Sequence, residues 1–199
     1  MTLFIKQRAD FAIADLTVTD FRKEYVLFTD PFMTTGLAIL IHKNHSQGIN
    51  SFANLADQTV VKYGVLSTGS THLMFNQSTD PLISRMYQQM TQTPDVFIDN
   101  FKEGIRRVKS TPFAMIVEQS SAEFITGRDC DLVFIEDQAN YYPRDFALAL
   151  PKNSPHLAKF NLAINAMKTS GKMQEIFNRY YRRCDLLKGV TFLVSLAFN

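Results

Sequence analysis

Short runs of consecutive apolar residues alternate along the chain with longer stretches in which apolar residues recur every three or four positions. Apolar runs that are bounded by turn-forming residues predict buried strands. The runs are residues 11–14, 36–41, 60–66, 113–117 and 146–150, and Pro151 closes the last of them. Because strands that alternate with helices are typical of α/β proteins, this order predicts an α/β fold.

The periodic stretches begin at residues that favour helix starts. Asp80, which precedes a proline, predicts an N-cap, and Asn100 with Glu103 three residues later has the pattern of a capping box. A third helix is expected after residues 154–155. Gly171 is expected to end that helix, after which the same period continues in a further one.

Composition and charge exclude several classes of protein. The 199 residues suit one large domain or two small ones. The net charge of +2 is too small for a nucleic-acid-binding surface, and 46% hydrophobic residues can fill a core. No stretch reaches about 18 uncharged apolar residues, and the start lacks a signal-peptide pattern. We therefore expect a soluble globular unit that does not bind nucleic acid.

The most distinctive local feature is the segment 64–71, GVLSTGST, which follows an expected strand and enters an expected helix. It nearly matches a phosphate-binding loop, but Ser70 stands where that loop needs its lysine, so a nucleoside triphosphatase is rejected. Backbone N–H groups at a helix start, with the hydroxyls of Ser70 and Thr71, suit a carboxylate. Taken alone, a glycine turn with a serine cap is the commoner explanation.

Two charged residues are candidates for ligand contacts. Arg22 follows the segment 16–19, where a lone arginine is more often a solvated surface charge. Glu118 directly follows the apolar run 113–117, and ligands bind at the carboxyl ends of strands in α/β sheets. A glutamate at the start of a helix explains Glu118 equally well.

Catalytic and metal-binding patterns are missing from the sequence. No carboxylate pair, Ser-His-Asp order or G-x-S-x-G motif is present, so we do not expect an enzyme. The two cysteines lack C-x-x-C spacing, and His42 and His45 lie in or beside a polar segment, 43–48, that we interpret as a linker. We therefore expect no metal and no other cofactor.

Taken together, these segments resemble the ligand-binding core of the ionotropic glutamate receptors, a family related to the bacterial amino-acid-binding proteins. Residues 9–22 read ADFAIADLTVTDFR, beside the family pattern A-D-x-A-x-x-P-L-T-I-T-x-x-R. Residues 28–36 read FTDPFMTTG, beside the pattern D-F-[ST]-x-P-[FY]-M-x-x-G from its phenylalanine onward. Further matching blocks are 49–59, 63–71, 96–118, 130–131, 151–154 and 179–184.

The resemblance implies a role for each candidate residue. Arg22 resembles the arginine that binds the α-carboxylate of the ligand, for which a bidentate guanidinium is the natural partner, and Thr17 adds a contact beside it. Ser70 and Thr71 resemble the pair that holds the ligand at the helix start, where a side-chain carboxylate suits glutamate. Glu118 resembles the acid that pairs with the α-ammonium group.

Several positions depart from the family pattern. Asp15 replaces a frequent proline and is expected to strengthen the ammonium site. Phe101 replaces a small hydroxyl residue, and Phe146 replaces a tyrosine; each change removes a polar group. Tyr180 and Tyr181 stand where tryptophans are usual. The preference for glutamate is therefore less secure than the binding of an amino acid.

The resemblance also implies a two-lobe clamshell of the periplasmic-binding-protein-like type II, with an incomplete lobe 1. Lobe 1 would consist of residues 1–37 and 152–184, lobe 2 of residues 38–150, and the hinge of the strands at 36–41 and 146–150. The family's pore helices would fall within 43–48, and residues 185–199 resemble the start of a membrane helix. Cys130 and Cys184 match the family's disulfide pair.

The expected function is thus the amino-acid-binding module of a ligand-gated ion channel, with L-glutamate as the first ligand to consider. Such a module lies on the extracellular face of the plasma membrane, in a receptor that is a homo- or hetero-oligomer. The alternative is a soluble extracellular or periplasmic amino-acid-binding protein that feeds a transporter. An enzyme on the same fold, such as a prephenate-type dehydratase, lacks an acid/base pair in this sequence.

Overall fold

The computed structural model describes residues 9–139 and 141–181. Three β-sheets and a set of helices make up these residues, in an alternating order that fits the α/β expectation. The elements, in chain order, are α2 (Asp20–Lys23), β1 (Val26–Phe28), β2 (Met33–Thr35), β3 (Leu37–His42), the 3-10 helix η1 (Lys43–His45), α3 (Phe52–Asp57), β4 (Lys62–Gly64), α4 (Ser70–Gln77), α5 (Pro81–Gln92), α6 (Phe101–Ser110), β5 (Phe113–Glu118), α7 (Gln119–Thr126), β6 (Leu132–Glu136), β7 (Arg144–Phe146), β8 (Ala149–Pro151), α8 (Leu157–Thr169) and α9 (Lys172–Tyr180).

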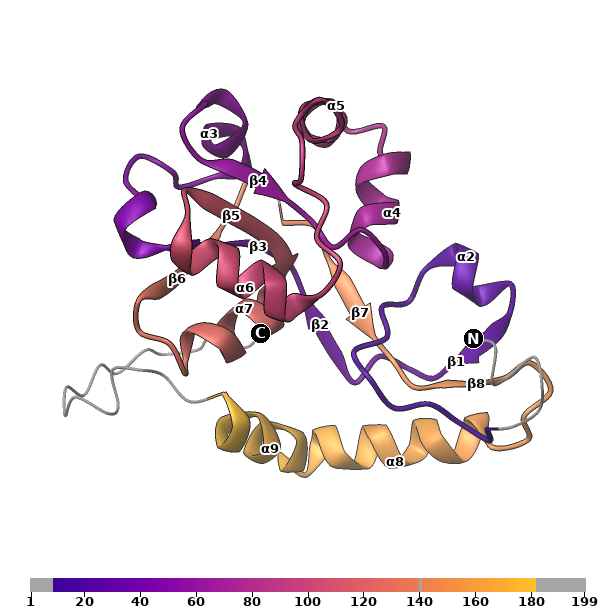
Figure 1. Ribbon diagram of the computed structural model, residues 1–199. Coiled ribbons are helices and arrows are strands. Elements are labelled where there is room, and N and C mark those ends of the chain that lie inside the picture. Colours follow the sequence, from indigo (N-terminus) through magenta and orange to yellow (C-terminus); the bar gives the residue numbers. More distant parts are fainter. Residues whose placement is uncertain (1–8, 140, 182–199) are drawn as a thin grey trace.

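The largest sheet has the strand order β4-β5-β3-β6 and forms the centre of what we call the larger body, together with α3 to α7. β3 pairs antiparallel with both β5 and β6, and β5 pairs parallel with β4. Residues 37–41 of β3 and 113–117 of β5 are buried, as uninterrupted apolar runs predict. Helices α6 and α7 pack against this sheet, while α3 and α4 both pack against α5 (Figure 1).

A second group of elements, which we call the smaller part, consists of α2, the antiparallel pair β1–β8, α8 and α9. The antiparallel pair β2–β7 lies between the larger body and this smaller part (Figure 1). Helices α8 and α9 follow one another along one side of the molecule. The Asn161 side chain accepts a hydrogen bond from the Asp30 backbone at 2.9 Å, and Lys168 donates to the Pro31 carbonyl at 2.6 Å, so α8 is attached to the chain before β2.

The expected helix starts are confirmed where they depend on local chemistry. The carboxylate of Asp80 accepts hydrogen bonds from the first turn of α5, at 2.8 Å from the Leu82 N–H. Asn100 caps α6 by accepting from the Glu103 N–H at 3.0 Å, but the Glu103 carboxylate binds Arg106, so the side-chain half of the capping box is not formed. Gly171, at φ 72°, separates α8 from α9 as expected.

Two of the expected strands are wrong: one is not formed, and the other is divided into two strands. Residues 11–14 form no strand: only Ala12 makes a bridge, to Ala149, and Ile13 is 67% exposed. An apolar run without a partner strand on either side has no ladder to join. Residues 146–150 are split between β7 and β8, because β7 pairs with β2 whereas β8 pairs with β1.

Other expectations need smaller corrections. The run 60–66 shortens to β4, and Val60 is 77% exposed. The segment 36–41, expected as a hinge strand, contains most of β3 at the centre of the large sheet, and β2 is the strand that pairs with β7. Strand β6 was not expected, and the third helix begins at Leu157, two residues after the expected start signal. The segment 43–48 contains η1.

Candidate functional site

Five of the six predicted ligand contacts line one cavity of about 130 Å³. They come from three segments far apart in the chain: one before β1, the start of α4, and the end of β5. These lining residues are Asp15, Arg22, Ser70, Thr71 and Glu118. The sixth residue, Thr17, contacts two of them, as described below.

The first residues of α4, with the glycine before them, line this cavity. Gly69, at φ 114°, is the N-cap residue, and this left-handed conformation favours glycine. Among the described residues no side-chain capping bond to α4 is present, and its N-cap residue, a glycine, has no side chain to accept from the first-turn N–H groups. Ser70 is therefore the first helical residue and not the cap, which rules out the serine-cap explanation of this segment.

Arg22 is anchored by its own neighbourhood. Its Nη1 donates a hydrogen bond to the Thr17 carbonyl at 2.7 Å, and its backbone N–H donates to the hydroxyl of Thr19, the N-cap of α2. Burial lowers the pKa of the Arg22 guanidinium, while the negative charges of Glu118 and Asp15 act in the opposite direction. Arginine keeps its proton in proteins, so Arg22 presents a fixed cation to the cavity.

Two hydroxyl contacts connect the segments that line the cavity. Ser70 Oγ donates to Thr17 Oγ1 at 2.9 Å, which joins the start of α4 to the segment before α2. Thr17 is buried and forms an antiparallel bridge with Phe146. Thr71 Oγ1 donates to Glu118 Oε1 at 2.8 Å. Glu118 is the N-cap residue of α7, makes no side-chain capping bond there, and lines the cavity.

A residue that the sequence reasoning missed is Arg144, on β7. Burial lowers its pKa, and the charge of Glu118 acts in the opposite direction, which places a second guanidinium in the electrostatic field of that carboxylate. One of its Nη atoms contacts the Met74 sulfur, and its buried Nε has no hydrogen-bond partner among residues 9–139 and 141–181. The sequence contains only a weak indication that Arg144 lies near the site. It stands two residues before Phe146 and therefore shares the same face of the strand.

The arrangement of charges determines which ligands the cavity suits. One cation, Arg22, and two carboxylates, Asp15 and Glu118, line the same small space. A zwitterion places its carboxylate against a guanidinium and its ammonium group against carboxylates, which satisfies both of its charges. Within residues 9–139 and 141–181, no group of three side chains is suited to hold a metal ion.

Cys130, which lies in the described part of the chain, is one of the two cysteines that are expected to form a disulfide. Its expected partner, Cys184, lies outside the described residues, so the pairing of these two cysteines stays a prediction. Among the described residues, no helix has the length and hydropathy needed to cross a membrane.

Comparison with known proteins identifies relatives over most of the chain. The sequence model of the bacterial extracellular solute-binding proteins, family 3, matches residues 1–183. A kainate-type ionotropic glutamate receptor of Caenorhabditis elegans is 34% identical over 73% of this chain, and kainate receptor 1 of Homo sapiens is 29% identical over 73%. The chain spans only 17% and 16% of the lengths of these two relatives.

A solved structure extends the comparison to the fold. The Drosophila muscle GluRIIB complex with glutamate superimposes with a TM-score of 0.84 at 28% identity, over 92% of this chain and 72% of that one. This likeness confirms the expected α/β fold of the periplasmic-binding-protein type.

Proposed function

Because the chain belongs to the family of the bacterial extracellular solute-binding proteins, family 3, we propose that it captures a free α-amino acid in the cavity of about 130 Å³. The observation that carries this proposal is the gathering of Arg22, Asp15 and Glu118 around one cavity. Arg22 binds the α-carboxylate, and Glu118 and Asp15 bind the ammonium group. Thr17 supports the guanidinium through its carbonyl.

The ligand joins two lobes that close over it. Lobe 1 consists of residues 1–37 and 152–184 and supplies the arginine, whereas lobe 2, residues 38–150, supplies Glu118 and the start of α4. The hydrogen bond between Ser70 and Thr17 crosses between these lobes and supports a closed arrangement. Since the two ends of a zwitterion bind opposite lobes, only the closed state satisfies both charges.

The module belongs to a ligand-gated ion channel, and L-glutamate is the first ligand to test. The kainate-type relatives and the glutamate complex of the Drosophila receptor support this assignment. The hydroxyls of Ser70 and Thr71, with the uncapped N–H groups of α4, would hold the side-chain carboxylate of glutamate. In this role the module lies on the extracellular face of the plasma membrane, in an oligomeric receptor, and it has no catalytic activity.

A soluble amino-acid-binding protein is the second candidate. It is favoured by the match to the bacterial extracellular solute-binding proteins, family 3. Both candidates use the same binding site, so binding measurements do not separate them. Sequencing the transcript across residues 43–48 does. A pore-encoding segment found at that point supports the receptor, and an uninterrupted transcript supports the soluble protein.

Calorimetric titration of the chain with L-glutamate and L-alanine tests the proposed site. Arg22→Ala should weaken binding by about 2–5 kcal/mol, because the ligand carboxylate is then buried without its partner. Thr71→Ala should weaken the binding of glutamate by only about 1 kcal/mol, the net contribution of one neutral hydrogen bond.

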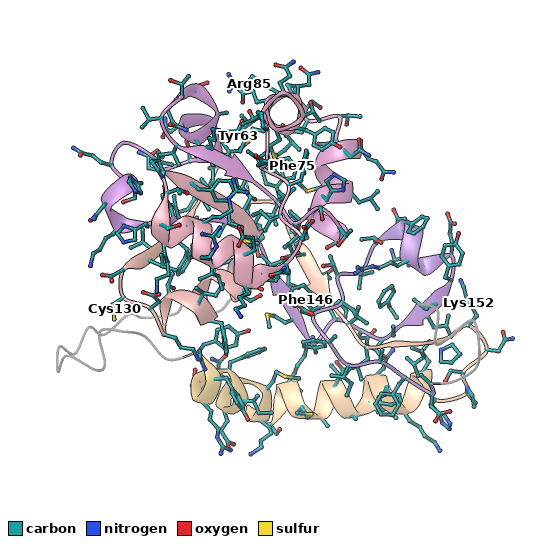
Figure 2. All side chains as sticks on the ribbon, viewed as in Figure 1. Tyr63, Phe75, Arg85, Cys130, Phe146 and Lys152 are labelled. Carbon is teal, nitrogen blue, oxygen red and sulfur yellow. The ribbon has the colours of Figure 1, made fainter. Side chains whose placement is uncertain are left out.

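Arg85→Ala is the matched control. Arg85 forms an ion pair with Asp57, has a half-exposed side chain, and lies at the end of the larger body away from Phe146 (Figure 2). If Arg22→Ala binds glutamate as tightly as Arg85→Ala does, the carboxylate of the ligand is bound elsewhere and the proposed site is wrong.

A further inference from the structure

A second and larger cavity, of about 530 Å³, adjoins the candidate site. Asp15 and Phe101 line both cavities, so the two spaces are neighbours, on either side of these residues or beside them. The larger cavity is formed between the larger body and α9, against the pair β2–β7. Phe146, which is one of its walls, lies between the larger body and the α8–α9 side of the molecule (Figure 2).

The walls of the larger cavity are apolar. Side chains from α6, α7, β7 and α9 supply most of them: Phe101, Ile105, Phe124, Ile125, Phe146 and Phe177. Among the described lining residues, Asp15 alone is charged, and it lines both cavities. A carboxylate inside this cavity would therefore gain no opposite charge from the described lining residues.

Two polar groups on its rim interact with other parts of the protein. The Ser120 N–H donates to Thr35 Oγ1 at 3.1 Å, and the Ser120 side chain acts on the Tyr181 phenol to lower its pKa. Burial raises the pKa of the Tyr181 phenol, so this group is neutral near pH 7. These interactions occupy hydrogen-bonding groups that a polar ligand would otherwise use. The remaining interior of the cavity is apolar.

The sizes of the two cavities fit two parts of one ligand. Pockets that bind small molecules usually measure about 300–1,000 Å³, and the polar cavity of about 130 Å³ falls below that range. Its charged lining, Arg22 with Asp15 and Glu118, suits an ammonium–carboxylate head group. The apolar cavity lies within the usual range, and its described lining residues include no oppositely charged pair.

We propose that the apolar cavity is the side-chain subsite of the amino-acid site, and that it accepts α-amino acids with a large apolar side chain. The inference rests on the proposed function, because the head group is held by Arg22 and Glu118. Glutamate would leave this subsite unfilled, since its carboxylate lies toward Ser70 and Thr71. An aromatic amino acid such as phenylalanine fills it, and the walls then contact the ring on several sides.

Calorimetric titration of the full chain with L-alanine, L-glutamate and L-phenylalanine tests the subsite. Alanine has the same head group as phenylalanine and no large side chain, so it measures the head-group contribution alone. Burial of the phenylalanine ring should make phenylalanine bind about tenfold to a hundredfold more tightly than alanine. Equal affinities for these two amino acids would overturn the inference while leaving the amino-acid site intact.

A variant that fills the cavity locates the effect. Ser121 lines the apolar cavity and not the polar one, so Ser121→Phe should remove the advantage of phenylalanine and leave alanine binding unchanged. If circular dichroism shows that Ser121→Phe is unfolded, Ser121→Leu replaces it, because leucine places a smaller side chain in the cavity. Ser110→Phe, at the exposed end of α6, is the matched control and should bind phenylalanine as the parent does.

The outcomes separate this inference from the function on which it rests. If phenylalanine binds more tightly than alanine but folded Ser121→Phe and Ser121→Leu keep that advantage, the apolar group lies elsewhere and the subsite is wrong. If alanine, glutamate and phenylalanine all fail to bind, the head-group site is wrong and the inference fails with it.

Discussion

Gly64, the last residue of β4, is the position at which a single methyl group should destabilise the fold most visibly. A Cβ atom added at Gly64 would lie 1.8 Å from the Val96 carbonyl oxygen and 2.7 Å from its carbonyl carbon. Because non-bonded heavy atoms pack at about 3.5 Å, the carbonyl would have to retreat by roughly 1.7 Å. The obstacle is backbone, so no side-chain rotation relieves it.

The backbone around Val96 is not free to retreat. The Ile98 N–H donates to the Val65 carbonyl at 3.0 Å, and the Ser67 N–H donates to the Ile98 carbonyl at 2.7 Å. Overpacking a core costs about 1–3 kcal/mol, and the loss of one of these backbone hydrogen bonds adds about 1 kcal/mol. Gly64→Ala should therefore lower the free energy of unfolding by about 3 kcal/mol, a large part of the ~5–15 kcal/mol typical of a domain.

Urea denaturation followed by far-UV circular dichroism, with linear extrapolation to water, measures this change. Gly48→Ala is the matched control: Gly48 is exposed at φ 79°, and its added Cβ would meet nothing within 4 Å. That variant should lose only the ~1–2 kcal/mol of a left-handed conformation. If Gly64→Ala proves no less stable than Gly48→Ala, the close approach of Val96 to β4 is wrong.

Three further predictions concern stability. Asp80→Ala removes the cap of α5 and should cost about 1 kcal/mol in the same urea assay; an unchanged midpoint would mean that the cap contributes nothing. Burial raises the pKa of Tyr63 from 10.0 to about 12, so the folded state holds this proton more tightly than the unfolded state. The resulting stability is fully present below pH 10 and is lost as the pH rises toward 12, and Tyr63→Phe should flatten that decline. If Cys130 pairs with Cys184, reduction should lower the free energy of unfolding by about 4 kcal/mol for a 54-residue separation, whereas two reactive thiols in unfolded, unreduced protein would reject the bridge.

The helix starts could be predicted from the sequence because their causes lie within a few residues. Asp80 and Asn100 each accept hydrogen bonds from N–H groups two or three positions later, so the local pattern contains all that is needed. Whether an apolar run forms a strand depended on neighbouring strands to pair with, and the composition of the run does not specify these. Residues 113–117 and 11–14 are both apolar runs, but the first lies between β3 and β4 whereas the second finds one bridge.

The candidate site shows the same division between local and distant causes. Ser70 and Thr71 at a helix start, and Glu118 after a strand, were visible as local patterns, but the ordinary explanation was the commoner one for the first two and equally good for Glu118. Only the resemblance to the receptor family predicted that they would meet Arg22, and the cavity that these residues line is consistent with that expectation. Arg144 could not be predicted from the sequence, because its burial near Glu118 does not follow from any local pattern.

The departures from the family pattern are the most informative part of the sequence once they are placed in space. Asp15, Phe101 and Phe146 each replace the residue type that the pattern favours, and all three line the apolar cavity. At two of these positions a polar group gives way to an unsubstituted ring, while the third adds a carboxylate that lines both cavities. A second carboxylate on the ligand gains nothing from these changes, since they remove donors and add negative charge. A ligand with one ammonium group and a large apolar side chain gains from all three, which is why the amino-acid head group and the apolar subsite are best tested together.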